Sequence, residues 1–209
     1  VDFLLRLFPR VAFTFLGDKY QQTNPFGIGD LSKIEGLHAY FGNVCLYELD
    51  NSYRSSEEIV EYSSKIIGNP RHNAFRLKNN HPVLEMELPS DGDKLSESIA
   101  TILQKRMDDN ETIGIITGDV DLAQKLFVKL SKMFDSVCLI KDANSFATGK
   151  VQILPVTLCK GLEFNTVLVI KNGGMFDSEL GNNLAYIACT RAINELIVYT
   201  KKQEKKNEV

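Results

Sequence analysis

Residues 113–134 read IGIITGDVDLAQKLFVKLSKMF, a short apolar run followed by an amphipathic segment. The run at 113–117 is apolar and rich in β-branched residues, which predicts a buried strand, and it ends at the turn signal Gly118-Asp119. In the segment 122–134 apolar side chains recur at helical spacing, which predicts a helix with one buried face. This unit of strand, turn and helix is typical of a parallel sheet covered by helices.

Similar units lie on both sides of this stretch. Apolar runs predict further strands at 11–16, 44–49, 83–88, 137–140, 151–158, 167–170 and 196–199, and helical spacing predicts helices at 95–107 and from Leu184 onward. Ser55 and Glu58 form a capping-box pattern, which predicts the start of a helix that reaches about Ile67. Strands that alternate with helices predict an α/β fold with a mostly parallel sheet and helices on both faces.

The composition limits the classes of function. Hydrophobic residues make up 44% and charged residues 24%, which is typical of a soluble globular protein. The net charge of −3 argues against a surface that holds nucleic acid by charge alone, so a polyanion would be held locally. No apolar run reaches the length of a membrane span, and we expect no membrane partner. The four cysteines contain no C-x-x-C pair and the three histidines have no ligand spacing, so we expect a cytoplasmic protein without a metal site of its own.

Arg191 ends the mostly apolar helical run NLAYIACTRA at 183–192. An arginine cannot lose its charge in a protein, so its place beside apolar side chains is unfavourable unless an anion or a hydrogen-bond acceptor meets it. A purely structural interpretation is a cation that complements the dipole at the carboxyl end of a helix.

Three more polar stretches accompany this helix: GDKYQ at 17–21, NSYRS at 51–55 and KGLEF at 160–164. With the arginine helix they fall next to predicted strands, and we expect them at the carboxyl ends of the strands, where sites gather in α/β folds. Each stretch alone also has a purely structural interpretation. The first is a common strand-to-turn signal, the second fits surface packing of a lone arginine, and the third could be a simple turn.

Taken together and in this order, the stretches resemble the superfamily 1 helicases of the UvrD/Rep type. FLGDKYQQ at 15–22 resembles the third motif of that family, NSYRSSEEI at 51–59 the fourth, LPVTLCKGLEFNTVLVI at 154–170 the fifth, and LAYIACTRAINELIV at 184–198 the sixth. In detail the last two look most similar to the HelD branch, which binds and recycles RNA polymerase. The resemblance implies a RecA-like fold.

In that family ATP lies between two RecA-like domains, and the first supplies the P-loop and the carboxylate that binds Mg²⁺. This sequence contains neither G-x-x-x-x-G-K-[ST] nor an Asp-Glu pair. The resemblance implies that residues 1–25 are the trailing strand of the first domain, 26–40 a linker, and 41–209 the second domain. An accessory domain before the fifth motif is not expected, because only residues 135–150 are available there. The Mg²⁺ ligands are expected from the absent first domain.

The resemblance also implies roles for single residues. Arg54 and Arg191 match the two arginines on the γ-phosphate, and Gln21 matches the glutamine that senses the γ-phosphate or the attacking water. Guanidinium groups suit the charge of a transferring phosphoryl group.

Six further positions complete the expected site. Three of them match ATP contacts of the family. Tyr53 would stack on adenine and Glu163 would lie near the ribose. At Gly161 the backbone would come close to the nucleotide or to the neighbouring domain. Those matched to nucleic-acid contacts are Phe26, Thr157 and Lys160. Thr157 replaces a family histidine, and Asn24 and Phe26 replace a tyrosine and a tryptophan, so one aromatic that stacks on bases is lost.

Three functions follow from these observations. The first is the second motor half of an ATP-driven DNA helicase or translocase acting on single-stranded DNA. The second is a HelD-like remodeller of RNA polymerase, which the acidic balance and the lost aromatic favour. The third is a self-contained α/β enzyme acting on a small molecule, for which this chain alone would bind and turn over its substrate.

Overall fold

The computed structural model describes residues 2–8, 11–23, 44–45, 47–49, 51–68, 73–76, 81–106, 111–142 and 149–201. Its centre is a six-stranded sheet in which every pair of neighbours is parallel. The strand order is β3 (Leu84–Glu87), β8 (Ala192–Thr200), β7 (Phe164–Lys171), β4 (Ile113–Thr117), β6 (Val151–Pro155) and β5 (Val137–Leu139). The predicted parallel sheet is confirmed, with each of these strands close to its expected place.

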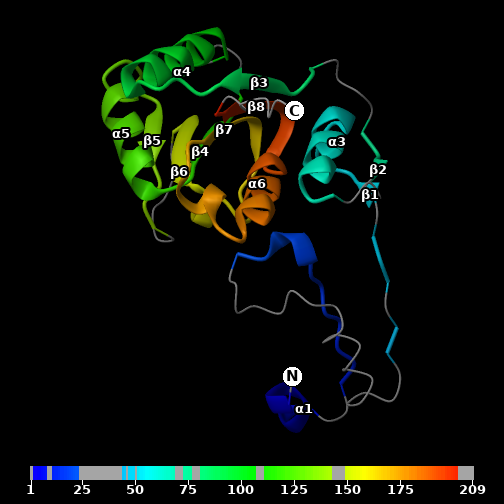
Figure 1. The fold of residues 1–209 in the computed structure, drawn as a ribbon. Helices are drawn as coiled ribbons and strands as arrows, with labels where there is room; N and C mark the ends of the chain where they lie inside the picture. The colour runs from blue at the N-terminus through cyan, green and yellow to red at the C-terminus, as the bar shows by residue number, and fades with distance from the viewer. Residues whose placement is uncertain are drawn as a thin grey trace, which may run out of the picture.

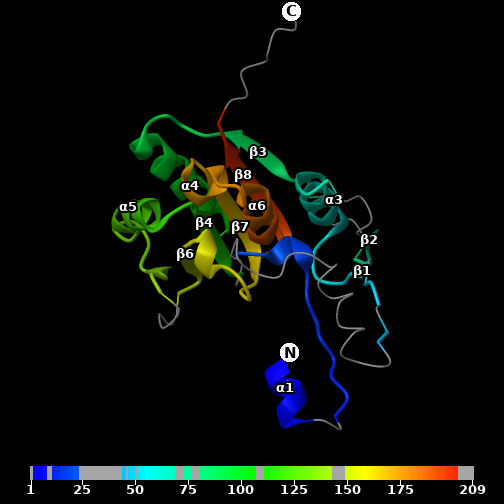
Figure 2. The ribbon, with the colours of Figure 1, turned by 60° about the horizontal axis from the view of Figure 1, so that its bottom comes forward.

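Helices cover both faces of the sheet, as expected from the sequence (Figure 1). One face carries α4 (Gly92–Arg106) and α5 (Val120–Leu130), and the other carries α3 (Glu57–Ile66) and α6 (Gly181–Cys189). Three 3-10 turns, η1 (Lys19–Gln21), η3 (Val156–Leu158) and η4 (Gly174–Asp177), and a small parallel pair, β1 (Asn51–Ser52) with β2 (Asn73–Ala74), complete the domain. The helix α1 (Asp2–Leu7) lies apart from the sheet (Figure 2).

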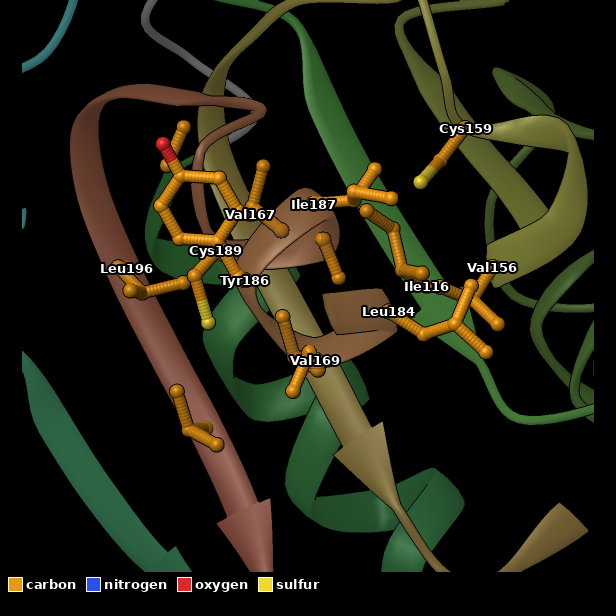
Figure 3. Close-up of a cluster of buried hydrophobic side chains, with 14 of the residues drawn as sticks. Ile116, Val156, Cys159, Val167, Val169, Leu184, Tyr186, Ile187, Cys189 and Leu196 are labelled. Carbon is orange, nitrogen blue, oxygen red and sulfur yellow. The ribbon is translucent and has the colours of Figure 1, made fainter. Parts of the chain in front are cut away.

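The central strands contribute to a core on each face. Within β7, Val167 and Val169 pack toward α6, whereas Leu168 and Ile170 pack toward α4 and α5. Because both faces are covered, all of β4 and residues 166–170 of β7 are buried, which is why the sequence shows mostly apolar runs there. Figure 3 shows the α6 side, where Leu184 and Ile187 lie over the strands.

Two predicted strands are wrong. Residues 11–16 and the described part of 44–49 are not in strands, and Leu16 and Leu49 are exposed. Apolar runs rich in β-branched and aromatic residues favour an extended chain, but a strand also needs a neighbour that accepts its backbone hydrogen bonds. Among the described residues, neither segment has such a neighbour. The expected linker at 26–40 lies outside the described residues.

The helix starts differ in how they are capped. Asp119 caps α5, since its Oδ1 accepts a hydrogen bond of 2.8 Å from the Leu122 N–H. The predicted capping box at Ser55 and Glu58 is wrong: Ser56 is the N-cap of α3 and makes no side-chain capping bond. The Ser55 hydroxyl instead donates to the Ala192 carbonyl at 2.6 Å and so joins the segment before α3 to the start of β8.

This difference gives a prediction on stability. Asp119→Ala should lower the free energy of unfolding by about 0.5–2 kcal/mol, the usual cost of losing an N-cap. Ser56→Ala is the matched control: its buried hydroxyl has no hydrogen-bond partner among the residues that the structure describes, so its removal should leave stability unchanged or higher. Urea denaturation of the purified chain measures both. Equal losses in the two variants would contradict the assignment of the caps.

Candidate functional site

Some of the residues singled out in the sequence lie at the amino edge of the sheet. Arg191 directly precedes β8 and Glu163 directly precedes β7, and the Phe164 N–H donates to the Arg191 carbonyl at 3.0 Å. The expectation that these stretches lie at the carboxyl ends of strands is therefore wrong for both residues. The reason is that α6 runs back across the sheet, so its last residues lie where the next parallel strand begins.

Arg191 is buried, with 2% of its surface exposed, and its hydrogen bonds go to neutral acceptors. Its Nε donates to the Ile187 carbonyl at 3.0 Å, and its Nη atoms donate to the Leu162 carbonyl at 3.4 Å and to Thr190 Oγ1 at 3.2 Å. These bonds use three of the five N–H groups of a guanidinium. Within the described part of the chain, no carboxylate lies at ion-pair distance from it.

The electrostatics of Arg191 follow from this burial. Loss of hydration lowers the pKa of Arg191, and the nearby Arg54 lowers it further, while Cys159 and Glu163 act in the opposite direction. A guanidinium nevertheless remains charged in a protein. The site thus holds a dehydrated cation beside a second cation, and an incoming anion would stabilise both.

Arg54 lies at the mouth of this site. One of its Nη atoms forms an ion pair of 2.7 Å with Glu163, and the two side chains are 41% and 44% exposed. Exposed pairs of this kind contribute only about 0–1 kcal/mol, so a more highly charged anion can replace the carboxylate. Glu163 was expected near a ribose; in the structure its partner is Arg54.

Gln21 comes from η1, which packs on α6. The Gln21 Nε2 donates to Asp18 Oδ2 at 2.9 Å, and the Lys160 ammonium donates to the Gln21 carbonyl at 3.0 Å. The Tyr20 ring also lies edge-on to Tyr186 of α6, with 6.0 Å between the ring centroids. Asp18 thus orients the Gln21 amide. In the sequence, this contact is indicated only by an aspartate three residues before a glutamine within the stretch 15–22.

Tyr53, Arg54 and Gln21 line one cavity of about 330 Å³ between the 51–55 segment, α3 and α6. Hydroxyl groups are common in its wall, and the buried Ser64 Oγ has no hydrogen-bond partner within the described ranges of the chain. The full lining is Gln21, Ser52, Tyr53, Arg54, Ser55, Ile59, Val60, Ser63, Ser64, Tyr186 and Thr190. The cavity is therefore lined by buried serine hydroxyls, from Ser63 and Ser64, and by the aromatic and cationic side chains of Tyr53 and Arg54.

The other residues predicted for the site lie in different parts of the fold. Gly161 has φ +90°, in the left-handed region that favours glycine, and a Cβ there would meet nothing, so the turn itself requires this glycine. Thr157 is exposed in η3, which follows the carboxyl end of β6, on the opposite edge from the arginines. Lys160 lies with Gln21, as described above. Phe26 and Asn24 lie outside the described residues.

Two further observations concern metals and membranes. The described residues contain no group of three or more histidine, cysteine, aspartate or glutamate side chains placed to hold a metal ion. Among the same residues, no helix has both the length and the apolar character that crossing a bilayer requires.

The fold resembles that of a solved C-terminal domain of a possible DNA helicase. No family model matches the sequence, and no curated protein matches it. The chain is similar to the crystal structure of the C-terminal domain of a possible DNA helicase from Lactobacillus plantarum WCFS1, with 26% identity and a TM-score of 0.54 over 72% of this chain and 88% of that chain. It also matches the arterivirus nonstructural protein 10 (helicase) in complex with DNA, with 10% identity and a TM-score of 0.42 over 57% of this chain and 28% of that one.

The parallel sheet with helices on both faces and the likeness to the bacterial domain define the class. The chain has an α/β, RecA-like fold of the helicase-like kind. Within that class it is similar to the C-terminal domain of a possible DNA helicase.

Proposed function

We propose that the chain is the second motor domain of an ATP-dependent, UvrD-like DNA helicase or translocase. Residues 1–25 would close a first motor domain, 26–40 would link the two, and 41–209 would form the second. One observation carries the proposal: Arg191, buried without a carboxylate at ion-pair distance in the described structure, lies beside Arg54 at one edge of the sheet. Such a pair suits the γ-phosphate of ATP.

The geometry leaves donors for that phosphate. Among the described residues, Arg191 makes three hydrogen bonds, which leaves two of its N–H groups for a phosphate, and Arg54 can exchange the Glu163 carboxylate for a phosphate oxygen. Gln21 is held at the same cavity by Asp18 and Lys160, where it would sense the γ-phosphate or orient the attacking water. Tyr53 would stack on the base, Glu163 would lie near the ribose, and Gly161 would let the neighbouring chain approach.

The remaining parts of the ATP site are assigned to a first motor domain. That domain would supply the P-loop and the carboxylate for Mg²⁺, which neutralises developing charge on the phosphates when it is bound. The residues of this chain would contribute cations, a glutamine and an aromatic surface. Closure of the two domains on ATP would complete the site, and reopening after hydrolysis would drive movement along a strand.

Nucleic acid would contact the opposite edge. Thr157 follows the carboxyl end of β6, and we assign it with Phe26 to single-stranded DNA. Lys160 was also matched to a nucleic-acid contact, and its ammonium bonds to the Gln21 carbonyl. The net charge of −3 fits a partner held by a few local contacts.

A HelD-like remodeller of RNA polymerase is the second candidate. The acidic balance and the asparagine at position 24 favour it, because both weaken contacts with single-stranded DNA. The ATP site would be the same, and closure would act on the polymerase rather than on a strand.

ATP hydrolysis by the full-length protein tests the proposal. We expect turnover that depends on Mg²⁺, with stimulation by single-stranded DNA for a translocase and copurification with RNA polymerase for a remodeller. The control is the 209-residue chain alone, which should not turn over ATP because it has no P-loop. Turnover by this chain at the full-length rate would contradict a shared site and support the self-contained enzyme.

A further inference from the structure

A segment outside all four motifs braces the residues of the candidate site. The strand β2 pairs in parallel with β1, with Asn73 opposite Asn51 and Ala74 opposite Ser52, and the Phe75 N–H continues the pairing with a bond of 2.8 Å to the Ser52 carbonyl. Figure 1 shows the two strands side by side beyond α3. The backbone just before Tyr53 is therefore held by residues 73–75.

Phe75 contacts the ring of Tyr53. The two ring centroids are 4.6 Å apart and the planes are tilted by 37°, although both side chains are mostly exposed. An exposed tyrosine without a neighbour would sample several rotamers, and ordering it on binding would be unfavourable. The contact with Phe75 orients the Tyr53 ring before a ligand arrives, which lowers that entropic cost.

Arg76 contacts the main chain of Arg54. One Nη atom donates to the Arg54 carbonyl at 2.8 Å, and the other donates to Asn194 Oδ1 at 3.2 Å. Asn194 belongs to β8, the strand that Arg191 directly precedes. The Arg76 guanidinium thus joins the backbone that carries Arg54 to the strand that follows Arg191.

We propose that Phe75 and Arg76 are positioning residues of the nucleotide site. Phe75 holds the Tyr53 ring for stacking on the base, and Arg76 sets the place of Arg54 relative to Arg191. The inference rests on the proposed function, in which Tyr53 meets the base and the two arginines meet the γ-phosphate. Neither positioning residue touches the nucleotide.

The two residues should affect different kinetic constants. In the full-length protein, Phe75→Leu should raise the KM for ATP by about 2- to 10-fold, the range of one aromatic pair, with kcat unchanged. Arg76→Gln should lower kcat by about 10-fold or more with KM unchanged, because small displacements of a catalytic group are costly in rate. Phe75→Tyr keeps an aromatic ring and should restore the native KM. Lys129→Gln, on α5 at the other face, is the control for loss of a cation and should change neither constant.

A ligand without a base separates positioning from a general loss of structure. Tripolyphosphate, used as a competitive inhibitor, should inhibit the Phe75→Leu protein as well as the native one, since it makes no contact with Tyr53. In a Tyr53→Leu background, Phe75→Leu should add no further rise in KM. An additive rise, or a matching loss of tripolyphosphate affinity, would overturn the role of Phe75.

Failure of the proposed function would look different. If Tyr53→Leu and Arg54→Ala leave ATP hydrolysis unchanged, the nucleotide site itself is wrong and the inference falls with it. If those two variants are impaired while Phe75→Leu and Arg76→Gln keep native KM and kcat, the nucleotide site stands and the positioning roles are overturned.

Discussion

Arg191→Ala should lower the ATP turnover of the full-length protein by about 10³-fold or more, the lower end of the range for arginine fingers. The buried guanidinium is held in place by carbonyl oxygens and Thr190. The N–H groups that it does not use in bonds to the described residues would therefore meet the γ-phosphate without a large loss of side-chain entropy. Steady-state ATPase measurements give kcat directly, and circular dichroism shows whether the variant is folded.

Two further variants distinguish a phosphate contact from a helix-end cation. Arg191→Lys keeps the charge at the end of α6 but lacks the planar fork, so turnover should stay low. Lys129→Ala removes an exposed cation from an ion pair on α5 and should leave turnover unchanged. If Arg191→Lys has the native kcat, or if a folded Arg191→Ala protein does, then Arg191 only complements the dipole at the carboxyl end of α6.

Arg54→Ala should lower turnover by about 10²-fold, the cost of removing one charge-stabilising donor from an active site. Folding should change little, because the ion pair with Glu163 is exposed on both sides. Measurement of kcat together with the thermal midpoint separates the two effects.

Glu163→Gln is the matched control for Arg54. If Arg54 serves only the ion pair, losing either partner should have the same effect. If Arg54 contacts phosphate, Arg54→Ala should impair kcat far more than Glu163→Gln, which removes the pair but leaves the guanidinium in place. Equal kcat values in the two variants would contradict the assignment of Arg54.

Much of the fold was predictable from the sequence. The central strands were predictable because strands covered on both faces are buried at successive positions and therefore mostly apolar, as in 113–117 and 167–170. The observed β7 is longer than expected, since Phe164 and Lys171 pair with β8 although their own pattern does not indicate a strand. The strands predicted at 11–16 and 44–49 were wrong because an apolar run indicates an extended chain but does not indicate whether a partner strand is present.

The candidate site was predictable as a set of residues but not as an arrangement. Motif resemblance singled out Arg54, Arg191 and Gln21, which the structure places around one cavity and its edge. The strand pattern placed Arg191 and Glu163 at the wrong edge of the sheet, and the four motifs do not include Phe75 and Arg76. Those two residues act through contacts with Tyr53 and the Arg54 backbone, and no spacing in the sequence reports such contacts.

By itself, the sequence determined that the chain forms a parallel sheet with a core on each face, because hydrophobic periodicity is a local property that each segment carries alone. The tertiary structure decided which polar residues meet and at which edge. Ser55 and Ala192 are 137 positions apart and still hydrogen-bonded, because α6 returns across the sheet before β8 begins. Convergence of this kind depends on how the connections cross the sheet, and therefore on packing of the whole domain.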